Sequence, residues 1–337
     1  QPQISLQLER PFTFGVPGLD RLLATISVIP KLIALLRSNS FDAIVLYAVP
    51  TYGAQVVWLA KRFGIPVIFR ALDVSHKIRK SIFSPAIKAV EKYIYKHVDL
   101  LSANNPAMAE YCVELSGRTR ATVVNLPPLD LFHFSKGIAD NSLRSQLGID
   151  ASDYVITYLG SFFYFSGLDT VIREFAAQSA SYPHAKLLLI GGGEQDSELR
   201  GLVSELGLAN KVVFTGFIPY ADLSKYLAMT TVAINPMRPG LVSNAAFPHK
   251  VIQYMASGLP VVSTKLAGLY KTFGGESGLA WSDSTEGLLV KALELSADKQ
   301  LCDSNAAKQS QVVSSKFGIE SAVDAFETAI RTVVQEK

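Results

Sequence analysis

The chain has 337 residues, of which 49% are hydrophobic and 18% are charged. This is the composition of a globular protein, and the length is sufficient for two domains. The formal net charge is only +3, and the sequence contains no nucleic-acid-binding motif. We therefore expect no nucleic-acid partner.

The cysteines and the longest uncharged segment bear on the compartment. Cys112 and Cys302 lie far apart in apolar surroundings, and we interpret both as buried thiols rather than a disulfide or metal pair. The uncharged segment 43–60 contains Pro50 and Gly53, which predicts a strand, a turn and a helix start rather than a membrane span. No signal peptide is visible, so we expect a cytoplasmic protein.

Apolar segments of strand length alternate with segments of helical periodicity along the chain. The candidate strands are 43–47, 67–70, 100–103, 122–125, 155–160, 186–190, 212–215, 232–235 and 260–263. Candidate helices between them include 53–63, 84–96, 168–179, 197–206, 221–228 and 250–256. This alternation predicts parallel sheets in doubly wound α/β domains.

The stretch 125–153 interrupts the alternation with Pro127, Pro128, Gly137 and a polar run. These residues are typical of a connection between domains. The predicted boundaries are a first domain over 1–134, a linker over 135–152, a second domain over 153–318, and a C-terminal helix over 319–337 that can cross back to the first domain.

The first domain is short for a doubly wound fold, because 43–47 is its first clear strand. We infer that one or two βαβ units of about 30 residues each are missing upstream, so the chain is either a fragment or a variant of the fold. Doubly wound domains bind ligands beyond the carboxyl ends of their strands. Two such domains are therefore expected to face one cleft.

Positive charge concentrates in the first domain, and most strongly in the segment 76–97. Six basic residues stand there against one acid, Glu91: Lys77, Arg79, Lys80, Lys88, Lys92 and Lys96. Apolar residues lie between them. One interpretation is a basic amphipathic surface that rests on an anionic membrane. The other is an ordinary amphipathic helix with a solvated face.

The segment 247–264, FPHKVIQYMASGLPVVST, predicts a helix that Pro248 opens and Gly258 ends, followed by a buried strand. Lys250 and Gln253 are three residues apart and share one face of this helix. A cation beside the free N–H groups of the first turn makes an anion site, and an amide one turn further can bind hydroxyls. Phosphate followed by sugar hydroxyls is the layout of a nucleotide-sugar pocket.

Three small-residue loops follow candidate strands of the second domain. They contain Gly160 with Ser161, Gly192 with Gly193, and Phe217 with Ile218. Glycines there allow close approach of a ligand to the backbone. Each glycine could equally just end its strand, but the three loops and the helix in this order form a specific pattern.

These motifs resemble those of glycosyltransferases with the GT-B fold, closest in the second half to the family 4 group. The resemblance covers about residues 155–265 well, and is looser in 69–73, 98–112 and 123–134. It implies two Rossmann-like domains facing a cleft, the first binding the acceptor and the second the nucleotide sugar. It also implies transfer of a sugar from a nucleotide-diphosphate sugar, with a UDP- or GDP-sugar expected, to a lipid-linked or polysaccharide acceptor.

The sequence departs from the family pattern at two places. Where the family often has two glutamates, this chain has Ala245 and Gln253, and the Lys-x-x-Gln-Tyr pattern is similar to bacterial polysaccharide glucuronosyltransferases. The loop after Gly160 has no Arg or Lys. The diphosphate is then expected to bind Lys250, helix-terminal N–H groups and the Gly192–Gly193 backbone.

Neither a metal nor a cofactor other than the donor sugar is expected. The sequence has no Asp-x-Asp motif and no His or Cys cluster with ligand spacing. Fixed donors and dipoles would then stabilise the departing nucleoside diphosphate.

Asp73 is the candidate base. It follows the strand 67–70, and the resemblance to the Arg-x-x-Asp of the glucuronosyltransferases implies that it deprotonates the acceptor hydroxyl. Asp73 could instead cap the next helix. Arg70 could contact Asp73, an acidic sugar or only its own domain, and His76 and His249 are surface or capping residues unless His249 faces the cleft.

Two other functions stay open: a nucleotide-sugar epimerase on the same fold, and a non-catalytic nucleotide-sugar-binding module. Gln253 and the cation-free loop after Gly160 favour the latter. The stereochemistry is also open, because the family 4 resemblance implies retention, whereas the Asp73 and Gln253 resemblance implies inversion.

Overall fold

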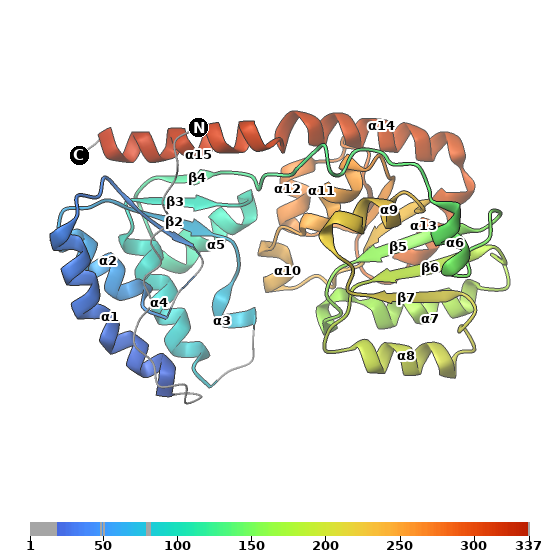
Figure 1. Cartoon of the computed structure of the whole chain (residues 1–337), viewed down its shortest axis with the longest axis horizontal. Helices are drawn as coiled ribbons and strands as arrows, with labels where there is room; N and C mark the ends of the chain where they lie inside the picture. The colour runs from blue at the N-terminus through green and yellow to red at the C-terminus, as the bar shows by residue number, and fades with distance from the viewer. Residues whose placement is uncertain (1–18, 48, 50, 79–81, 336–337) are drawn as a thin grey trace. The chain divides into compact units, whose positions relative to one another are not determined.

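The computed structural model describes residues 19–47, 49, 51–78 and 82–335. Its internal contacts divide the chain into two units (Figure 1). Unit 1 comprises Gln1–Asn104, Met108–Asn125 and Phe326–Lys337, and unit 2 comprises Asn105–Ala107 and Leu126–Ala325. Both contain parallel sheets covered by helices, which confirms the predicted α/β fold class. The prediction that βαβ units are missing upstream concerns a region outside the residues that the structure describes.

Unit 1 contains a four-stranded parallel sheet in the order β1-β2-β3-β4. Its elements in chain order are α1 (Leu19–Ser38), β1 (Ile44–Tyr47), α2 (Gly53–Arg62), β2 (Val67–Ala71), α3 (Ser75–Ile78), α4 (Ser84–His97), β3 (Leu100–Ala103), α5 (Pro106–Ser116) and β4 (Thr122–Val124). The last turns of α15 (Ile319–Gln335) pack on one face of this sheet, where Ala329 and Val333 contact Ile68 and Leu100. Helices α1 and α2 lie on the opposite side of the sheet (Figure 1).

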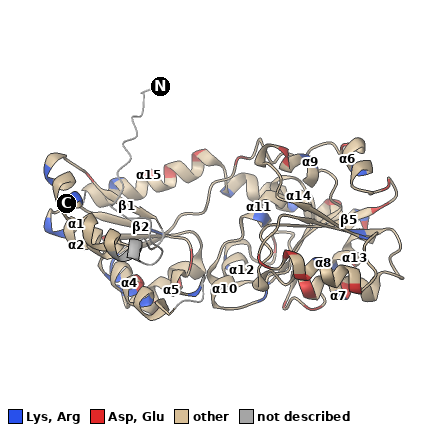
Figure 2. Cartoon of the chain, turned by 60° about the horizontal axis from the view of Figure 1, so that its bottom comes forward, with Lys and Arg blue, Asp and Glu red and all other residues tan. Residues whose placement is uncertain are grey.

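Helix α4 is amphipathic in the way the sequence predicts. Pro85 suits its first turn because an N–H is not needed there. Lys88, Lys92 and Lys96 are exposed at intervals of four, whereas Ile94 is buried. Figure 2 shows this basic helix in unit 1 and the acidic residues of α7 and α8 in unit 2. Among the described residues, no helix combines the length and the apolar character needed to span a membrane.

Unit 2 contains a six-stranded parallel sheet in the order β10-β9-β8-β5-β6-β7. Its strands are β5 (Tyr154–Leu159), β6 (Ala185–Ile190), β7 (Val212–Gly216), β8 (Val232–Asn235), β9 (Val261–Thr264) and β10 (Ala280–Ser282). Its helices are α6 (Asn141–Gln146), η1 (Tyr164–Ser166), α7 (Leu168–Gln178), α8 (Asp196–Glu205), η2 (Tyr220–Asp222), α9 (Leu223–Leu227), α10 (Leu241–Ala245), α11 (His249–Ala256), α12 (Ala267–Phe273), α13 (Leu288–Ala297), α14 (Lys299–Lys316) and the first part of α15.

Both faces of this sheet are buried. In β6, Leu188 and Ile190 join a core with α11, whereas Leu187 and Leu189 join a second core with α7, α8 and α13. Two-sided burial explains why its strands are continuous apolar runs rather than alternating ones. The chain leaves β5 toward β6 on one side, while β8 lies on the other side, so the strand order reverses between β5 and β8. Such a switch point leaves a crevice for a ligand at the carboxyl ends of the strands.

The predicted linker, 135–152, contains a short helix. Asp140 caps α6 by accepting hydrogen bonds from the backbone N–H groups of Ser142 (2.8 Å) and Leu143 (3.3 Å). Just before this segment, Phe134 is fully buried in the core of unit 2, and the N–H of Leu129 donates to the carbonyl of Phe317 (2.8 Å). Residues 126–153 are therefore anchored on unit 2.

Candidate functional site

The loops that follow β5, β6 and β7 are joined to one another at the carboxyl edge of the unit 2 sheet. The N–H of Phe162 donates to the carbonyl of Gly192 at 3.0 Å, and the N–H of Gly191 donates to the carbonyl of Gly216 at 3.0 Å. Because these bonds are between backbone groups, they fix the loops independently of their side chains. The three predicted glycine loops thus form one connected surface.

Glycine is required in this surface by the packing of loop against loop. A Cβ at Gly191 (φ +126°) would lie 2.1 Å from the carbonyl oxygen of Gly160. A Cβ at Gly193 (φ +159°) would lie 2.8 Å from the backbone nitrogen of Phe162. A larger residue at either position would separate the loops.

Lys250 lies at the start of α11, directly against the β5 loop. Its Nζ is 3.9 Å from the centroid of the Tyr158 ring, and a Cβ on Gly160 would be 3.0 Å from the same atom. Among the residues that the structure describes, none forms an ion pair or hydrogen bond with this ammonium. Burial lowers the pKa of Lys250 to about 7, because removal of water disfavours the charged form. A bound anion would reverse that effect.

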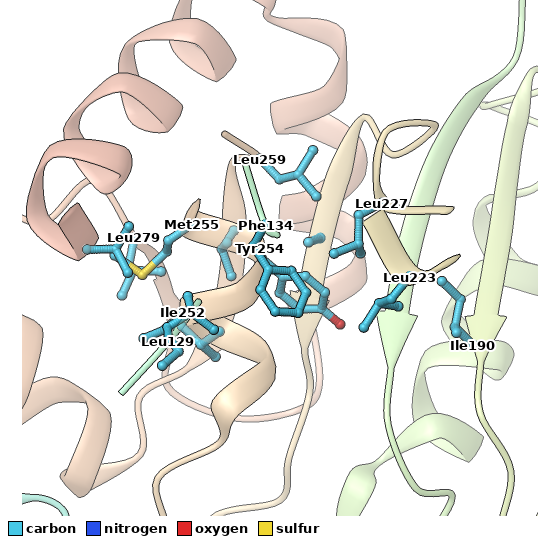
Figure 3. Close-up of a cluster of buried hydrophobic side chains, with 14 of the residues drawn as sticks. Leu129, Phe134, Ile190, Leu223, Leu227, Ile252, Tyr254, Met255, Leu259 and Leu279 are labelled. Atoms are coloured by element: carbon cyan, nitrogen blue, oxygen red, sulfur yellow. The ribbon is translucent and has the colours of Figure 1, made fainter. Parts of the chain in front are cut away.

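Helix α11 is held in place by its buried face. The N–H of Leu159 donates to the Tyr254 hydroxyl at 2.6 Å, so α11 is tied directly to the end of β5. Tyr254, Ile252 and Met255 lie in the same apolar cluster (Figure 3). The opposite face of the helix presents Lys250 and Gln253. Gln253 is half-buried, and its side chain has no hydrogen-bond partner within the described part of the chain.

An exposed aromatic ring borders the same surface. The side chain of Phe217 is 80% exposed, and a Cβ on Gly192 would lie 3.1 Å from its ring. Ile218 packs on the core of unit 2 and anchors this loop. Ser161 is exposed in the neighbouring loop. The arrangement offers a flat apolar ring next to a backbone edge, which suits a planar ligand group.

Asp73 stands in unit 1, between the end of β2 and the start of α3. Its side chain is exposed, and no described residue donates a hydrogen bond to it, so the structure shows no capping bond from Asp73 to α3. The surrounding protein displaces enough water to raise the pKa of this carboxyl above its ordinary value. Asp73 is therefore a carboxylate without a structural partner at the carboxyl edge of the sheet.

Arg70 is engaged inside unit 1. The residue is only 7% exposed. It donates to the Ser102 hydroxyl (2.7 Å) and the Asn125 carbonyl (2.6 Å), and its guanidinium lies 5.7 Å from the ring centroid of Phe326. These contacts join β2, β3, the end of β4 and α15, and they favour the structural interpretation of Arg70.

The two histidines differ. His76 is buried and contacts the carboxylate of Glu91, so it is not the surface residue that the sequence suggests. His249 is exposed beside Lys250, and its ring packs edge-on against Phe247 with centroids 6.3 Å apart.

Sequence reasoning missed Arg238, which follows β8 on the other side of the crevice. Its Nη2 donates to both carboxylate oxygens of Asp169 at 2.7 Å, and its Nη1 donates to the Tyr164 carbonyl. The guanidinium also covers the Tyr164 ring at 4.6 Å. Arg238 therefore fixes the aromatic loop after Gly160. An arginine just after a strand at the reversal of strand order was the signal that could have revealed it.

The structure thus gathers most of the predicted site on unit 2, namely Gly160, Ser161, Gly192, Gly193, Phe217, Ile218, Lys250 and Gln253. Asp73 and Arg70 belong to unit 1. In the part of the chain that the structure describes, no group of three His, Cys, Asp or Glu side chains is arranged to hold a metal ion.

Comparison with known families gives a match for each half of the chain. The family described as "Glycosyl transferases group 1" matches residues 153–298, and the "Glycosyl transferase 4-like domain" matches residues 7–128.

Two curated relatives illustrate the distance to proteins with assigned activities. N-acetyl-alpha-D-glucosaminyl L-malate synthase of Bacillus anthracis is 24% identical over 58% of this chain and 49% of its own length. D-inositol 3-phosphate glycosyltransferase of Gordonia bronchialis is 24% identical over 83% of this chain and 64% of its own length. The chain therefore spans about half to two thirds of the length of these two relatives.

Solved structures share the fold. The Anabaena protein HepE in complex with UDP has a TM-score of 0.77 at 19% identity, over 95% of this chain and 85% of that one. Sucrose-phosphate synthase from Thermosynechococcus elongatus has a TM-score of 0.77 at 20% identity, over 96% and 81% of the two chains. The predicted GT-B fold is confirmed by these likenesses.

Proposed function

We propose that this chain, which belongs to the two glycosyltransferase families that match its halves, transfers a sugar from a nucleotide-diphosphate sugar to an acceptor hydroxyl. We further propose UDP as the nucleotide, since HepE has been crystallised with UDP and with UDP-glucose. In this proposal unit 2 binds the donor, and unit 1 supplies the base.

The observation that carries the proposal is the Lys250 ammonium, which is buried without a counterion beside Gly160. A buried amine is costly unless an anion pairs with it. A diphosphate would be that anion, held also by the first N–H groups of α11 and the backbone of Gly192 and Gly193. The positive charge of Lys250 replaces that of a divalent metal, so we propose that transfer is metal-independent.

The remaining site residues fit the rest of a nucleotide. The Gln253 amide, one turn along α11 from Lys250, can accept one hydrogen bond and donate another to the ribose hydroxyls. The exposed Phe217 ring offers a stacking surface for the base. These assignments follow from spacing and exposure on unit 2.

For the reaction itself, we assign the base to Asp73. Its carboxylate takes the proton of the acceptor hydroxyl while that oxygen bonds to the anomeric carbon, and the bond from that carbon to the diphosphate oxygen breaks. The electron pair leaves with the nucleoside diphosphate, whose charge Lys250 stabilises. Direct displacement of this kind inverts the anomeric centre, and the anomeric configuration of the product tests it.

The experiment that tests the site is UDP binding measured by isothermal titration calorimetry. Lys250→Ala should abolish measurable binding at UDP concentrations that saturate the unaltered chain. The matched control is Lys265→Ala, because the Lys265 ammonium also covers a tyrosine ring, 4.2 Å from the centroid of Tyr270, but the residue is exposed. Equal affinity in Lys250→Ala and the control would refute the assignment.

One observation supports a second candidate, a module that binds a nucleotide sugar without transferring it. The loop after Gly160 contains no Arg or Lys, and Arg238 is already occupied by Asp169. The departing nucleoside diphosphate then has one cation fewer to stabilise its negative charge. Tight UDP-glucose binding with no release of UDP, with or without EDTA and across an acceptor panel, would favour this module over the transferase.

We also propose that the acceptor is lipid-linked and that α4 brings unit 1 to an anionic membrane. Lys88, Lys92 and Lys96 form an exposed row, and Ile82 and Phe83 at the start of α4 are 89% and 61% exposed. Cations for the headgroups beside apolar side chains for the interface are the elements of such a surface. Arg79 and Lys80, which the sequence adds to it, lie outside the described residues.

Co-sedimentation with phosphatidylglycerol and phosphatidylcholine vesicles tests this surface. Charge reversal of the α4 row (K88E/K92E/K96E) should abolish binding to the anionic vesicles only. The matched control reverses three exposed lysines of α14 (K299E/K308E/K316E), which changes the net charge equally. An equal loss of vesicle binding in both triple variants would show that the chain is attracted to anionic lipid through its net charge, and would exclude a dedicated membrane surface on α4.

A further inference from the structure

A buried histidine–glutamate pair lies three residues from Asp73 and has no role in the proposed reaction. Nδ1 of His76 is 2.5 Å from Oε2 of Glu91. His76 is 5% exposed and Glu91 is fully buried. The pair connects α3, which follows Asp73, to the middle of α4.

The surroundings of the pair offer few alternatives. The Tyr111 hydroxyl lies 3.5 Å from the same nitrogen of His76, and Tyr95 and Cys112 are buried in the same cluster. Oε1 of Glu91 has no hydrogen-bond partner among the described residues. The Glu91 carboxyl group therefore depends on His76 for its hydrogen bond, because a buried polar group without a partner is destabilising.

The segment that carries Asp73 has little local structure to hold it. Helix α3 is only four residues long, and a helix of that length is not stable alone. The Asn104 amide donates to the carbonyl of Leu72 just before it (3.1 Å). Within residues 73–77, its anchors are the buried side chain of Val74, a turn in which the N–H of Lys77 donates to the Val74 carbonyl (2.9 Å), and His76. Among the anchors within 73–77, His76 makes the side-chain hydrogen bond to α4, and a hydrogen bond constrains the orientation of the groups that it joins.

We propose that the His76–Glu91 pair is a positioning device for Asp73: it ties α3 to α4 and thereby fixes the carboxylate that deprotonates the acceptor. His76 and Glu91 touch no substrate in this proposal. The inference rests on the proposed role of Asp73 as base, but its physical claim concerns the order of residues 73–77 and can be measured without a substrate.

The test uses variants that keep or remove the directed hydrogen bond. His76→Asn places an amide N–H where Nδ1 stood, and Glu91→Gln keeps an oxygen acceptor, so both should preserve the position of Asp73. The double variant H76L/E91L removes both polar side chains and leaves an apolar contact, which should maintain folding but release α3. Amide hydrogen exchange at residues 73–77 should then accelerate by about tenfold to a hundredfold.

A second readout is the NMR titration of the Asp73 carboxyl. In H76L/E91L the raised pKa of Asp73 should move toward the ordinary value of aspartate, and in His76→Asn it should not. The control is Asp99→Ala, which removes the carboxylate that accepts a hydrogen bond from the Val67 N–H (2.9 Å) at the other end of β2. That variant should weaken unit 1 without changing the titration of Asp73 or exchange at 73–77.

The outcomes separate the two proposals. Unchanged exchange and titration in H76L/E91L, or equal changes in Asp99→Ala, would overturn the positioning role. If instead Asp73→Asn leaves the release of UDP from UDP-glucose unaltered, the proposed base is wrong even where the pair positions it. With both ideas correct, H76L/E91L lowers kcat while UDP affinity is unchanged, and His76→Asn keeps the kcat of the unaltered chain.

Discussion

Two cations, the buried Arg70 of unit 1 and the half-buried Lys250 of unit 2, differ in the contacts that surround them. Arg70 in unit 1 donates to a hydroxyl and a backbone carbonyl and lies over an aromatic ring. Lys250 in unit 2 has a tyrosine ring on one side and no acceptor among the described residues. Both side chains have lost water, and only Arg70 has replaced it with hydrogen bonds.

This difference distinguishes a cation that binds a ligand from one that stabilises the fold. A partnered cation stabilises the fold, so its removal should reduce stability. An unpartnered cation destabilises the empty fold, as the lowered pKa of Lys250 shows, so its removal should reduce ligand binding and leave stability intact.

The largest expected effect is on turnover in Lys250→Met. Loss of the charge that stabilises the leaving group should lower the release of UDP from UDP-glucose by about 10²–10³-fold, as removal of one oxyanion donor does in other enzymes. The free energy of unfolding, measured in urea, should stay within about 1 kcal/mol of the unaltered chain or rise. A large loss of stability would place Lys250 in the same class as Arg70.

Arg70→Met should show the opposite pattern. The carbonyl of Asn125 and the hydroxyl of Ser102 would lose a charged donor while staying buried, which should lower the free energy of unfolding by about 2–3 kcal/mol. UDP affinity, measured under native conditions, should be unchanged. Reduced UDP affinity in a folded Arg70→Met chain would contradict the structural role.

The fold was predictable where the signal is local. Alternation of apolar strands and helices predicts β5 to β9, and Pro248 and Gly258 predict the ends of α11. Helix α14 was missed because its sequence is largely polar, and only Cys302, Gln309 and Val313 are buried. It depends on tertiary contacts such as the bond from the Gln309 amide to the Gly278 carbonyl at 2.7 Å.

The site divides in the same way. Lys250 and Gln253 were predictable because one helix turn places them together. The bidentate pair of Arg238 and Asp169 was not, since it joins residues 69 positions apart. Nor could the sequence reveal that His76 is buried against Glu91, because that contact depends on how α3 packs on α4. Local periodicity contains no information on such pairings.

The pH dependence of UDP binding sharpens the contrast further. In the free chain the pKa of Lys250 is lowered to about 7, and a bound diphosphate should raise it. Binding above pH 7 then requires uptake of a proton, so affinity should fall as pH rises through 7, by up to about tenfold per pH unit. Calorimetry in buffers of different ionisation enthalpy would detect the proton, and Lys250→Arg should remove this dependence.

The same pKa predicts the direction in which the free energy of unfolding changes with pH. The unfolded chain binds the Lys250 proton up to about pH 10.4, whereas the folded chain binds it only up to about pH 7. The free energy of unfolding should therefore increase as pH rises above 7, because the unfolded state then binds more protons than the folded state. Lys250→Met should therefore be more stabilising at pH 6 than at pH 9. A stability difference that does not vary with pH would show that the amine is not held neutral by burial.

The smallest effect is expected for Arg238, a partnered cation beside the same crevice. Its ion pair with Asp169 is partly exposed, with side chains 23% and 27% accessible, so Arg238→Lys should lower the free energy of unfolding by less than about 1 kcal/mol. The lysine cannot bind both carboxylate oxygens and the Tyr164 carbonyl in the same planar geometry, and the aromatic loop after Gly160 should loosen. UDP affinity should change less than in Lys250→Ala, because the charge of Arg238 is already balanced. If the two variants weaken UDP binding equally, then the presence of an acceptor for a cation does not distinguish structural cations from ligand-binding cations in this chain.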